Sequence, residues 1–211
     1  MNILVTGGAG SIGSEIIRQI ANYNVKKLII IDQAETPLYR IQSEISTNYP
    51  ELNFEPLVAD VSNFEKLDHI FKNYKPEVVY HAAAYKHVPL MENNPYEAVS
   101  VNIGGTKNVV DVAVKHSVDK FVLISTDKAV NPTNVMGATK RIAELYVSCL
   151  KGKGHTKFIT TRFGNVLGSN GSVVPLFKRQ IEEGGPVTIT HPDIIRYFMT
   201  IPEACQLVLE A

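Results

Sequence analysis

A glycine-rich turn between a short strand and a helix constrains the fold of this chain more than any other feature. Residues 1–6 form a short apolar run, and an apolar stripe at helical spacing begins at Ile16. Between them stand three glycines, at Gly7, Gly10 and Gly13. Such glycines let the backbone turn tightly and approach a pyrophosphate, which the first helical amides, at Ser11 and Ile12, would face. The pattern predicts a dinucleotide site.

A carboxylate ends the second predicted strand. Asp32 follows the apolar residues 28–31, roughly 20 positions beyond the glycines, where a ribose hydroxyl would be bound. A carboxylate there repels a 2′-phosphate, so NAD is predicted in preference to NADP. Arg40 could approach a phosphate, but we expect it on an exposed helix face. The alternative is a plain strand-to-helix turn in which Asp32 only caps a helix.

Strands and helices alternate along most of the chain. After the glycine turn and its helix, strands are predicted at residues 27–31, 54–60, 78–81, 120–124 and 157–162, and helices at 37–47, 64–72, 95–115 and 134–150. This alternation predicts an α/β fold, a Rossmann-type doubly wound parallel sheet with helices on both faces. We assign it to residues 1–164.

The pattern changes beyond Gly164. A loop at residues 168–171, a helix at 173–181, a short strand at 187–189 and a helix from Pro202 are predicted. We assign residues 165–211 to a smaller C-terminal substrate lobe. The last helical pattern ends without a capping signal, so we expect the lobe to be incomplete and the chain truncated.

Composition excludes several classes of protein. The 21 basic and 21 acidic residues balance, so no electrostatic footprint for nucleic acid is visible. No apolar run approaches the ~18 residues of a membrane span, and the amino terminus lacks a signal-peptide pattern. Cys149 and Cys205 lie in apolar helical patterns and are predicted to be buried free thiols, and the histidines lack metal-site spacing. A cytoplasmic enzyme without a metal is favoured.

An acid and an amine stand side by side at the end of the fifth predicted strand. Thr126, Asp127 and Lys128 come just beyond the apolar residues 120–124. Open α/β sheets bind ligands at such strand ends. Residues 131–134 then break the chain and cap a helix on which Met136 and Lys140, four positions apart, share a face. This arrangement is typical of an acid–base site, and the alternative is a solvated turn.

Six segments give the chain a specific resemblance. They are Thr6–Gly13 (TGGAGSIG), His81–Val88 (HAAAYKHV), Val101–Thr106 (VNIGGT), Ser125–Ala129 (STDKA), Arg162–Val166 (RFGNV) and His191–Phe198 (HPDIIRYF). The chain resembles the extended short-chain dehydrogenases/reductases, which are Rossmann-fold enzymes. Within them it is similar to the UDP-N-acetylglucosamine 4,6-dehydratases of polysaccharide biosynthesis, including that of capsules. The resemblance covers essentially all 211 residues.

The resemblance implies a reaction and a role for each clustered residue. NAD⁺ accepts a hydride from C4 of the sugar, which acidifies the C5 proton, and the hydride returns to C6 after water is lost. Lys128 is implied to remove the C5 proton as a neutral amine, and Asp127 to protonate the leaving C6 hydroxyl. Thr126 is implied to hydrogen-bond near the C4 oxygen. Lys140 is implied to bind the nicotinamide ribose.

Met136 departs from the pattern of the superfamily. Most relatives carry a tyrosine there, whose phenol removes the C4 hydroxyl proton, and a thioether has no proton to exchange. Asp127 or an ordered water is our candidate acceptor. A methionine-bearing subset of the dehydratases resembles this chain, often as the cytoplasmic part of a larger membrane protein. That subset is associated with retention of the C5 configuration.

Further positions carry weaker predictions. Asp60 and Val61 are predicted to flank the adenine, with a plain turn as the alternative, and Ala82 and Ala83 are small enough to let the cofactor pass. The resemblance implies that Val166 contacts the cofactor and that Asn165 and Arg196 contact the nucleotide sugar. Lys86 and His87 either meet the cofactor or the sugar diphosphate, or lie in an exposed loop. Relatives form homo-oligomers through helices such as 95–115 and 134–150.

Three functions remain open from the sequence. The first is 4,6-dehydration of a UDP-sugar. The second is a nucleotide-sugar 4-epimerase or dehydrogenase of the same fold, which would need the tyrosine and not the adjacent acid and amine. The third is an NAD-binding module without turnover, impaired by Met136 and a short substrate lobe.

Overall fold

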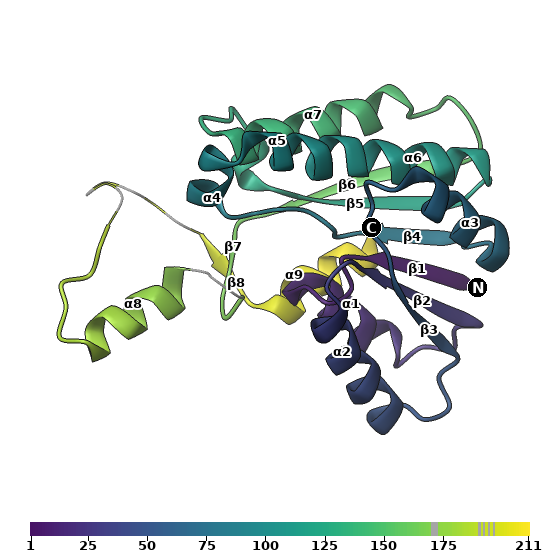
Figure 1. Ribbon diagram of the computed structural model, residues 1–211, viewed down its shortest axis with the longest axis horizontal. Helices are drawn as coiled ribbons and strands as arrows, with labels where there is room; N and C mark the ends of the chain where they lie inside the picture. Colours follow the sequence, from purple (N-terminus) through teal and green to yellow (C-terminus); the bar gives the residue numbers. More distant parts are fainter. Residues whose placement is uncertain (170–172, 190, 192, 194, 196) are drawn as a thin grey trace.

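A six-stranded parallel sheet forms the centre of the protein, in the order β3-β2-β1-β4-β5-β6 (Figure 1). The computed structural model describes residues 1–169, 173–189, 191, 193, 195 and 197–211. The strands are β1 (Asn2–Thr6), β2 (Lys27–Asp32), β3 (Phe54–Val58), β4 (Val78–His81), β5 (Lys120–Thr126) and β6 (Lys157–Phe163). The order reverses between β1 and β4, and ligands of Rossmann folds bind at this switch point. The predicted fold class is confirmed.

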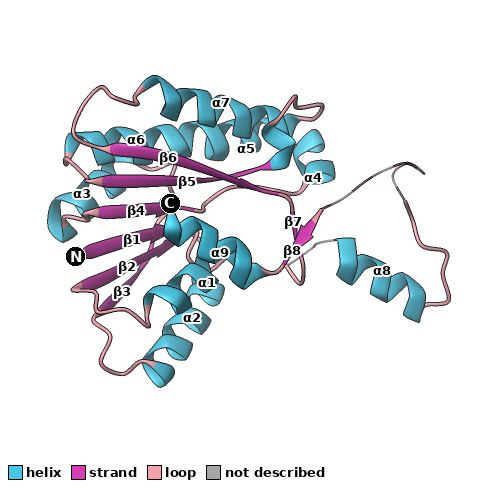
Figure 2. Cartoon of the chain, turned by 180° about the vertical axis from the view of Figure 1, so that it is seen from behind, coloured by secondary structure: helices cyan, strands magenta, loops and turns pink. Residues whose placement is uncertain are grey.

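Helices cover both faces of the sheet, which explains why its central strands β1, β2, β4 and β5 are mainly apolar and buried (Figure 2). On one face, α1 (Ser11–Ile20), α2 (Glu35–Asn48) and α9 (Ile201–Glu210) share a core that contains Ile17, Ile45 and Val208. On the other face lie α3 (Phe64–Tyr74), α6 (Thr106–Lys115) and α7 (Val135–Cys149), around Phe71, Val109 and Val147.

The helix predicted at residues 95–115 contains a change of geometry. After α4 (Val88–Asn93), α5 (Pro95–Ala98) passes into the π-helical segment η1 (Val99–Gly105) and then into α6. Asn102 in η1 is buried, and its side chain hydrogen-bonds both the amide and the carbonyl of Tyr85, at 2.8 and 3.0 Å. Apolar periodicity does not encode this segment, whereas π-helical turns are frequent at functional sites.

The segment beyond β6 leaves the sheet and returns to it. β7 (Asn165–Val166) pairs with β8 (Phe198–Met199). Between them α8 (Val173–Glu182) buries none of its described residues and stands apart from the sheet in Figures 1 and 2. The predicted strand at 187–189 is wrong, because these residues are exposed and the Thr188 amide donates to the Gln180 side chain of α8, at 3.1 Å, instead of to a strand.

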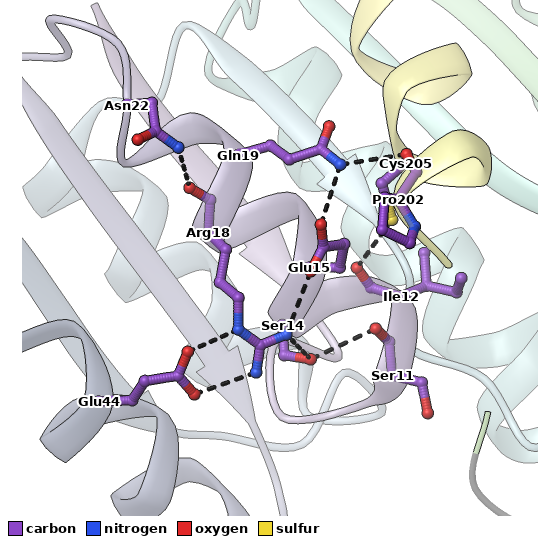
Figure 3. Close-up of polar contacts among 10 residues, drawn as sticks. All are labelled: Ser11, Ile12, Ser14, Glu15, Arg18, Gln19, Asn22, Glu44, Pro202 and Cys205. Carbon is purple, nitrogen blue, oxygen red and sulfur yellow. Dashed lines mark hydrogen bonds and ion pairs between the residues drawn. The ribbon is translucent and has the colours of Figure 1, made fainter. Parts of the chain in front are cut away.

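The last helix packs on the glycine-bearing helix rather than on α8. A capping box between Thr200 and Glu203 starts α9. Gln19 on α1 donates to the Pro202 carbonyl at 3.1 Å, and the Cys205 thiol donates to the Ile12 carbonyl at 3.5 Å (Figure 3). The helix assigned from sequence to the substrate lobe therefore shares the core of the sheet. The division at residue 164 remains a prediction.

The two cysteines differ in burial. Cys205 is buried as predicted, and burial raises the pKa of its thiol to about 12. Cys149 is exposed, which contradicts the prediction, because it ends α7 beyond Val147, the last buried residue of that helix. Among the described residues, no helix has both the length and the apolar character needed to cross a membrane.

Candidate cofactor and catalytic site

A cavity of about 140 Å³ lies at the carboxyl ends of β1, β2, β3 and β4, around the switch point of the sheet. Its wall includes seven of the predicted cofactor residues, namely Gly7, Gly10, Asp32, Asp60, Val61, Ala82 and Ala83. The wall is completed by Ile31, Gln33, Ala59, Ala84, Tyr85 and Val101. Segments far apart in the sequence thus meet at one site, as a dinucleotide would require.

The glycine loop is packed too closely to accept larger residues. Gly7 has a φ of 65°, and a Cβ atom there would lie 2.6 Å from the amide nitrogen of Ala83. A Cβ on Gly13 would lie 2.1 Å from the carbonyl oxygen of Gly7. A pyrophosphate needs this close approach of bare backbone at the start of a helix. The loop therefore fits the phosphates of NAD.

Both oxygens of Asp32 are held by backbone amides at the rim of the cavity. Oδ2 accepts from the Ala9 amide and Oδ1 from the Ala34 amide, each at 2.9 Å. These bonds fix the carboxylate beside the glycine loop, and each oxygen keeps a lone pair for a ribose hydroxyl. Asp60 similarly accepts from the Ser62 amide at 2.8 Å. Arg40 is exposed, as expected.

Side chains on α1 anchor the glycine-bearing helix to its neighbours (Figure 3). Arg18 donates two hydrogen bonds to Glu44 of α2, at 2.6 and 3.0 Å. Gln19 bonds Glu15 at 3.0 Å in addition to Pro202 of α9. α1 is thus held by α2 on one side and by α9 on the other, and this fixes the direction of the helix whose first amides would face the phosphates.

Several predicted cofactor residues do not line the cavity. Ser11, Ile12 and Gly13 form the start of α1 behind Gly10, and Val166 lies in β7. Lys140 is buried on α7, where its ammonium donates to the Ile124 carbonyl at 2.7 Å. Burial lowers the pKa of Lys140 to about 8, although the negative charge of Glu144 opposes the shift. Their cofactor contacts remain predictions.

Asp127 and Lys128 form an ion pair at the carboxyl end of β5, in the 3₁₀ turn η2 (Asp127–Ala129). Lys128 Nζ donates to Asp127 Oδ1 at 3.0 Å, and the Thr126 hydroxyl donates to the same oxygen at 2.9 Å. Burial opposes ionisation of Asp127, but these two hydrogen bonds outweigh it and lower the pKa of the carboxyl. The three predicted catalytic residues are therefore in mutual contact.

α7 and β7 both approach this ion pair closely. A Cβ on Gly137 of α7 would lie 2.3 Å from the Lys128 carbonyl oxygen, so a larger residue could not be accepted there. Lys128 Nζ also donates to Asn165 Oδ1, at 3.2 Å. Asn165, which was predicted to contact the substrate, thus holds the amine in place.

Met136 lies in an apolar cluster. Its side chain is 3% exposed and packs with Met91 of α4 and Ala98 of α5, beside Tyr85. The structure thus provides a packing reason for the thioether.

The remaining predicted substrate residues are less confined. Lys86 and His87 lie in an exposed loop before α4, where partial desolvation lowers the pKa of both side chains. Arg196 lies outside the described residues. In the part of the chain that the structure describes, no group of three His, Cys, Asp or Glu side chains could hold a metal ion.

A buried histidine beneath the cavity was missed from the sequence. His81 Nδ1 lies 2.7 Å from the Thr6 hydroxyl, and Nε2 lies 3.0 Å from the Thr106 hydroxyl. Thr106 donates its proton to the Asn102 carbonyl, so it accepts from Nε2, and Nδ1 accepts from Thr6. Burial, and secondarily the charge of Lys140, lowers the pKa of His81 to about 3. The signal available in the sequence was a polar residue, His81, at the end of an otherwise apolar strand.

This histidine makes stability fall in acid. The unfolded chain takes up a proton near pH 6.5 and the folded chain only near pH 3, so the free energy of unfolding falls by up to about 5 kcal/mol as the pH drops through this range. We expect His81→Gln to flatten the pH dependence of the free energy of unfolding between pH 6.5 and 4. Urea titrations at several pH values measure it, with exposed His155→Gln as the control. Parallel curves for wild type and His81→Gln would contradict the assignment.

The second missed residue is Glu144 on α7. It is buried and accepts hydrogen bonds from Ser125, Arg162 and Arg141. A single acidic residue in a helix usually predicts a solvated face, so no local pattern indicated that this one is buried.

Comparisons with known proteins agree with this geometry. Residues 3–211 match the family model described as "Polysaccharide biosynthesis protein". Over 211 residues the chain is 57% identical to the capsular polysaccharide biosynthesis protein CapD of Staphylococcus aureus, covering 99% of this chain and 35% of that protein. It is 38% identical to a UDP-N-acetylglucosamine 4,6-dehydratase (inverting) of Campylobacter jejuni and 37% to a UDP-glucose 4-epimerase of Rickettsia rickettsii. Each of these matches covers 99% of this chain and 62% of the relative.

Solved structures show the same fold. Pen from Bacillus thuringiensis superposes with a TM-score of 0.90 at 37% identity, over 99% of this chain and 64% of that one. The UDP-glucose 4-epimerase of Thermus thermophilus, solved in complex with NAD, has a TM-score of 0.82 at 24% identity, over 98% and 72% of the two chains. The chain therefore spans about two thirds or less of the curated relatives it matches. It belongs to the polysaccharide biosynthesis protein family of extended short-chain dehydrogenases/reductases.

Proposed function

We propose that this chain carries the NAD-binding and acid–base machinery for 4,6-dehydration of a UDP-amino sugar, with UDP-N-acetylglucosamine as the expected substrate. The observation that carries the proposal is the contact of Asp127 with Lys128 at the sheet edge that also forms the cavity. The relative from Campylobacter jejuni named for this reaction supports it. The product would be a 4-keto-6-deoxy sugar for polysaccharide biosynthesis.

The ion pair holds the one proton that the elimination needs. When that proton moves along the 3.0 Å hydrogen bond, Lys128 becomes a neutral amine and Asp127 a carboxylic acid. The amine then removes the C5 proton and the acid protonates the leaving C6 hydroxyl, so that the sugar loses water. This step leaves the pair as ammonium and carboxylate. When the hydride returns to C6, the Lys128 ammonium would donate its proton to C5, and the proton released from the C4 hydroxyl would pass through Asp127 or an ordered water back to Lys128. Thr126, which donates to Asp127, would lie near the C4 oxygen.

NAD would supply the hydride acceptor at C4 and the hydride donor at C6. Gly7, Gly10 and the first turn of α1 would bind its pyrophosphate, and Asp32 its adenosine ribose. The carboxylate of Asp32 is the reason to propose NAD over NADP. Asp60, Val61, Ala82 and Ala83 would surround the adenosine half, and Lys140 would bind the other ribose.

An assay for net redox change tests the proposal. Protein is incubated with UDP-N-acetylglucosamine and NAD⁺, and the expected product is a 4-keto-6-deoxy sugar without accumulated NADH. The assay is run on this chain and on a form extended to the length of its relatives. Accumulation of NADH would indicate a dehydrogenase. NAD⁺ binding without conversion in the extended form would indicate a binding module.

The second candidate function is 4-epimerisation of a UDP-sugar, because a relative of 37% identity is named for that activity. Both reactions require a group that removes the C4 hydroxyl proton, and Met136 cannot do so. Epimerisation, however, makes no use of the adjacent acid and amine of Asp127 and Lys128. Recovery of a UDP-sugar changed only at C4 would favour this function over dehydration.

Replacing Met136 by tyrosine should not raise the turnover of dehydration. The larger ring must enter the cluster of Met91 and Ala98, and overpacking typically costs about 1–3 kcal/mol. We expect a lower midpoint of thermal unfolding and an unchanged or lower kcat. Met136→Leu, which keeps an apolar side chain of similar volume, is the control. A strong rise in kcat for the tyrosine variant would instead show that methionine at this position means the loss of a catalytic tyrosine.

We further propose that the protein forms a homo-oligomer in the cytoplasm. Tyr96, Val99, Ile142 and Leu145 are exposed on α5, η1 and α7, and these elements lie together on one side of the sheet (Figure 1). Burial of this surface against a second copy would remove it from water. Sedimentation of the purified protein would measure the oligomeric state.

A further inference from the structure

Glu144 is the most heavily bonded buried carboxylate near the site. Its side chain is 4% exposed and accepts from Ser125 Oγ at 2.6 Å. Arg162 donates to both of its oxygens, at 2.7 and 2.5 Å, and Arg141 adds a bond of 3.1 Å. Removing this carboxylate and its partners from water costs free energy of desolvation, so we consider what its position does for the site.

Ser125 and Arg162, two partners of Glu144, lie close in sequence to the proposed catalytic groups or to residues that contact them. Ser125 directly precedes Thr126, Asp127 and Lys128 at the end of β5. Arg162 lies on β6, three residues before Asn165, which bonds Lys128. Lys140 stands one helical turn before Glu144 on α7, and positions four apart share a helix face. One carboxylate thus links the three elements that carry the site.

Lys140 is surrounded by charged and titratable groups from each of these elements. Glu144 faces it from α7, with Arg162 of β6 on the far side of that carboxylate, and His81 of β4 is neutral beneath the cavity. Beyond Ile124, the Asp127–Lys128 pair carries no net charge. Burial acts against the ammonium, and Glu144 is the group that favours it.

We propose that Glu144 is a positioning residue that keeps Lys140 charged for cofactor binding and fixes the β5 and β6 strand ends around Lys128. The inference rests on the proposed function, because it takes the Lys140 ammonium to donate to the cofactor. A purely structural carboxylate would fix the strands without tuning the proton affinity of Lys140.

The pH dependence of NAD⁺ binding separates these roles. NAD⁺ is titrated calorimetrically into the protein between pH 6 and 9.5, and the pH at which affinity is half lost reports Lys140. Glu144→Gln should lower this midpoint by about one pH unit, because a negative charge is removed. Arg162→Gln should raise it, because the negative charge of Glu144 is then less neutralised. Lys140→Met should abolish the pH dependence.

Lys157→Gln is the matched control, since it removes an exposed charge near the opposite end of β6 from Arg162, and its midpoint should equal that of wild type. Arg141→Gln removes one hydrogen bond to Glu144 where Arg162→Gln removes two, so its midpoint should rise by less. If Glu144→Gln fails to fold, the upward shift in Arg162→Gln still tests the inference. Equal midpoints for wild type and both variants would overturn the role of Glu144 while leaving the proposed function intact. Failure of the wild type to bind NAD⁺ at any pH would instead overturn the proposed function itself.

Discussion

Lys128→Met should lower kcat for dehydration at least a hundredfold, because general base catalysis contributes about 10²–10⁴ to such rates. The variant keeps the length of the side chain but cannot accept the C5 proton, and it removes the ion pair with Asp127. NAD⁺ affinity should stay near that of wild type, since Lys128 is not part of the cavity wall. Product formation is measured under substrate saturation.

Asp127→Asn should show a similar loss, because an amide cannot protonate the leaving hydroxyl. Lys72→Met on the exposed surface of α3 is the control and should retain full activity. Activity above a tenth of wild type in Lys128→Met would show that another group removes the C5 proton.

Gly13→Ala should destabilise the protein by about 3 kcal/mol and abolish detectable NAD⁺ binding. The new methyl group would lie 2.1 Å from the Gly7 carbonyl oxygen and 2.9 Å from Gly8 Cα, and both of these are backbone atoms. Relief requires α1 to move away from the loop, at a cost in the upper part of the range for overpacking. The amides that would face the pyrophosphate move with it.

Urea unfolding and calorimetric titration with NAD⁺ measure the two effects. Gly104→Ala is the matched control, because the nearest atom to a methyl group there is the Val99 carbonyl oxygen at 3.9 Å. It should bind NAD⁺ like wild type. Wild-type affinity in Gly13→Ala would place the pyrophosphate away from this loop.

The cofactor cavity could be predicted because its signals are local. Gly7, Gly10 and Asp32 mark turns at strand ends, and a parallel sheet brings successive strand ends to one edge. The contact of Asp127 with Lys128 was equally local, since the two are neighbours in sequence.

The missed features depend on packing between distant segments. His81 and Glu144 find their partners 75 and 18 residues away, at Thr6 and Arg162, and single residues of these types usually predict a solvated position. Cys149 was misassigned because helical periodicity does not reveal where α7 leaves the core. The strand predicted at 187–189 is absent because a high β propensity produces a strand only where another strand lies beside it to pair with.

The pairing of β7 with β8 places Asn165 opposite Phe198 and Val166 opposite Met199. The excursion that carries α8 therefore departs and rejoins at a single short ladder, while α9 resumes the Rossmann core beyond it. A segment whose two ends meet in this way can be replaced by another without altering the order of the six strands. Under the proposed function, a change in this segment would alter the choice of sugar while the sheet that would bind NAD keeps its strand order.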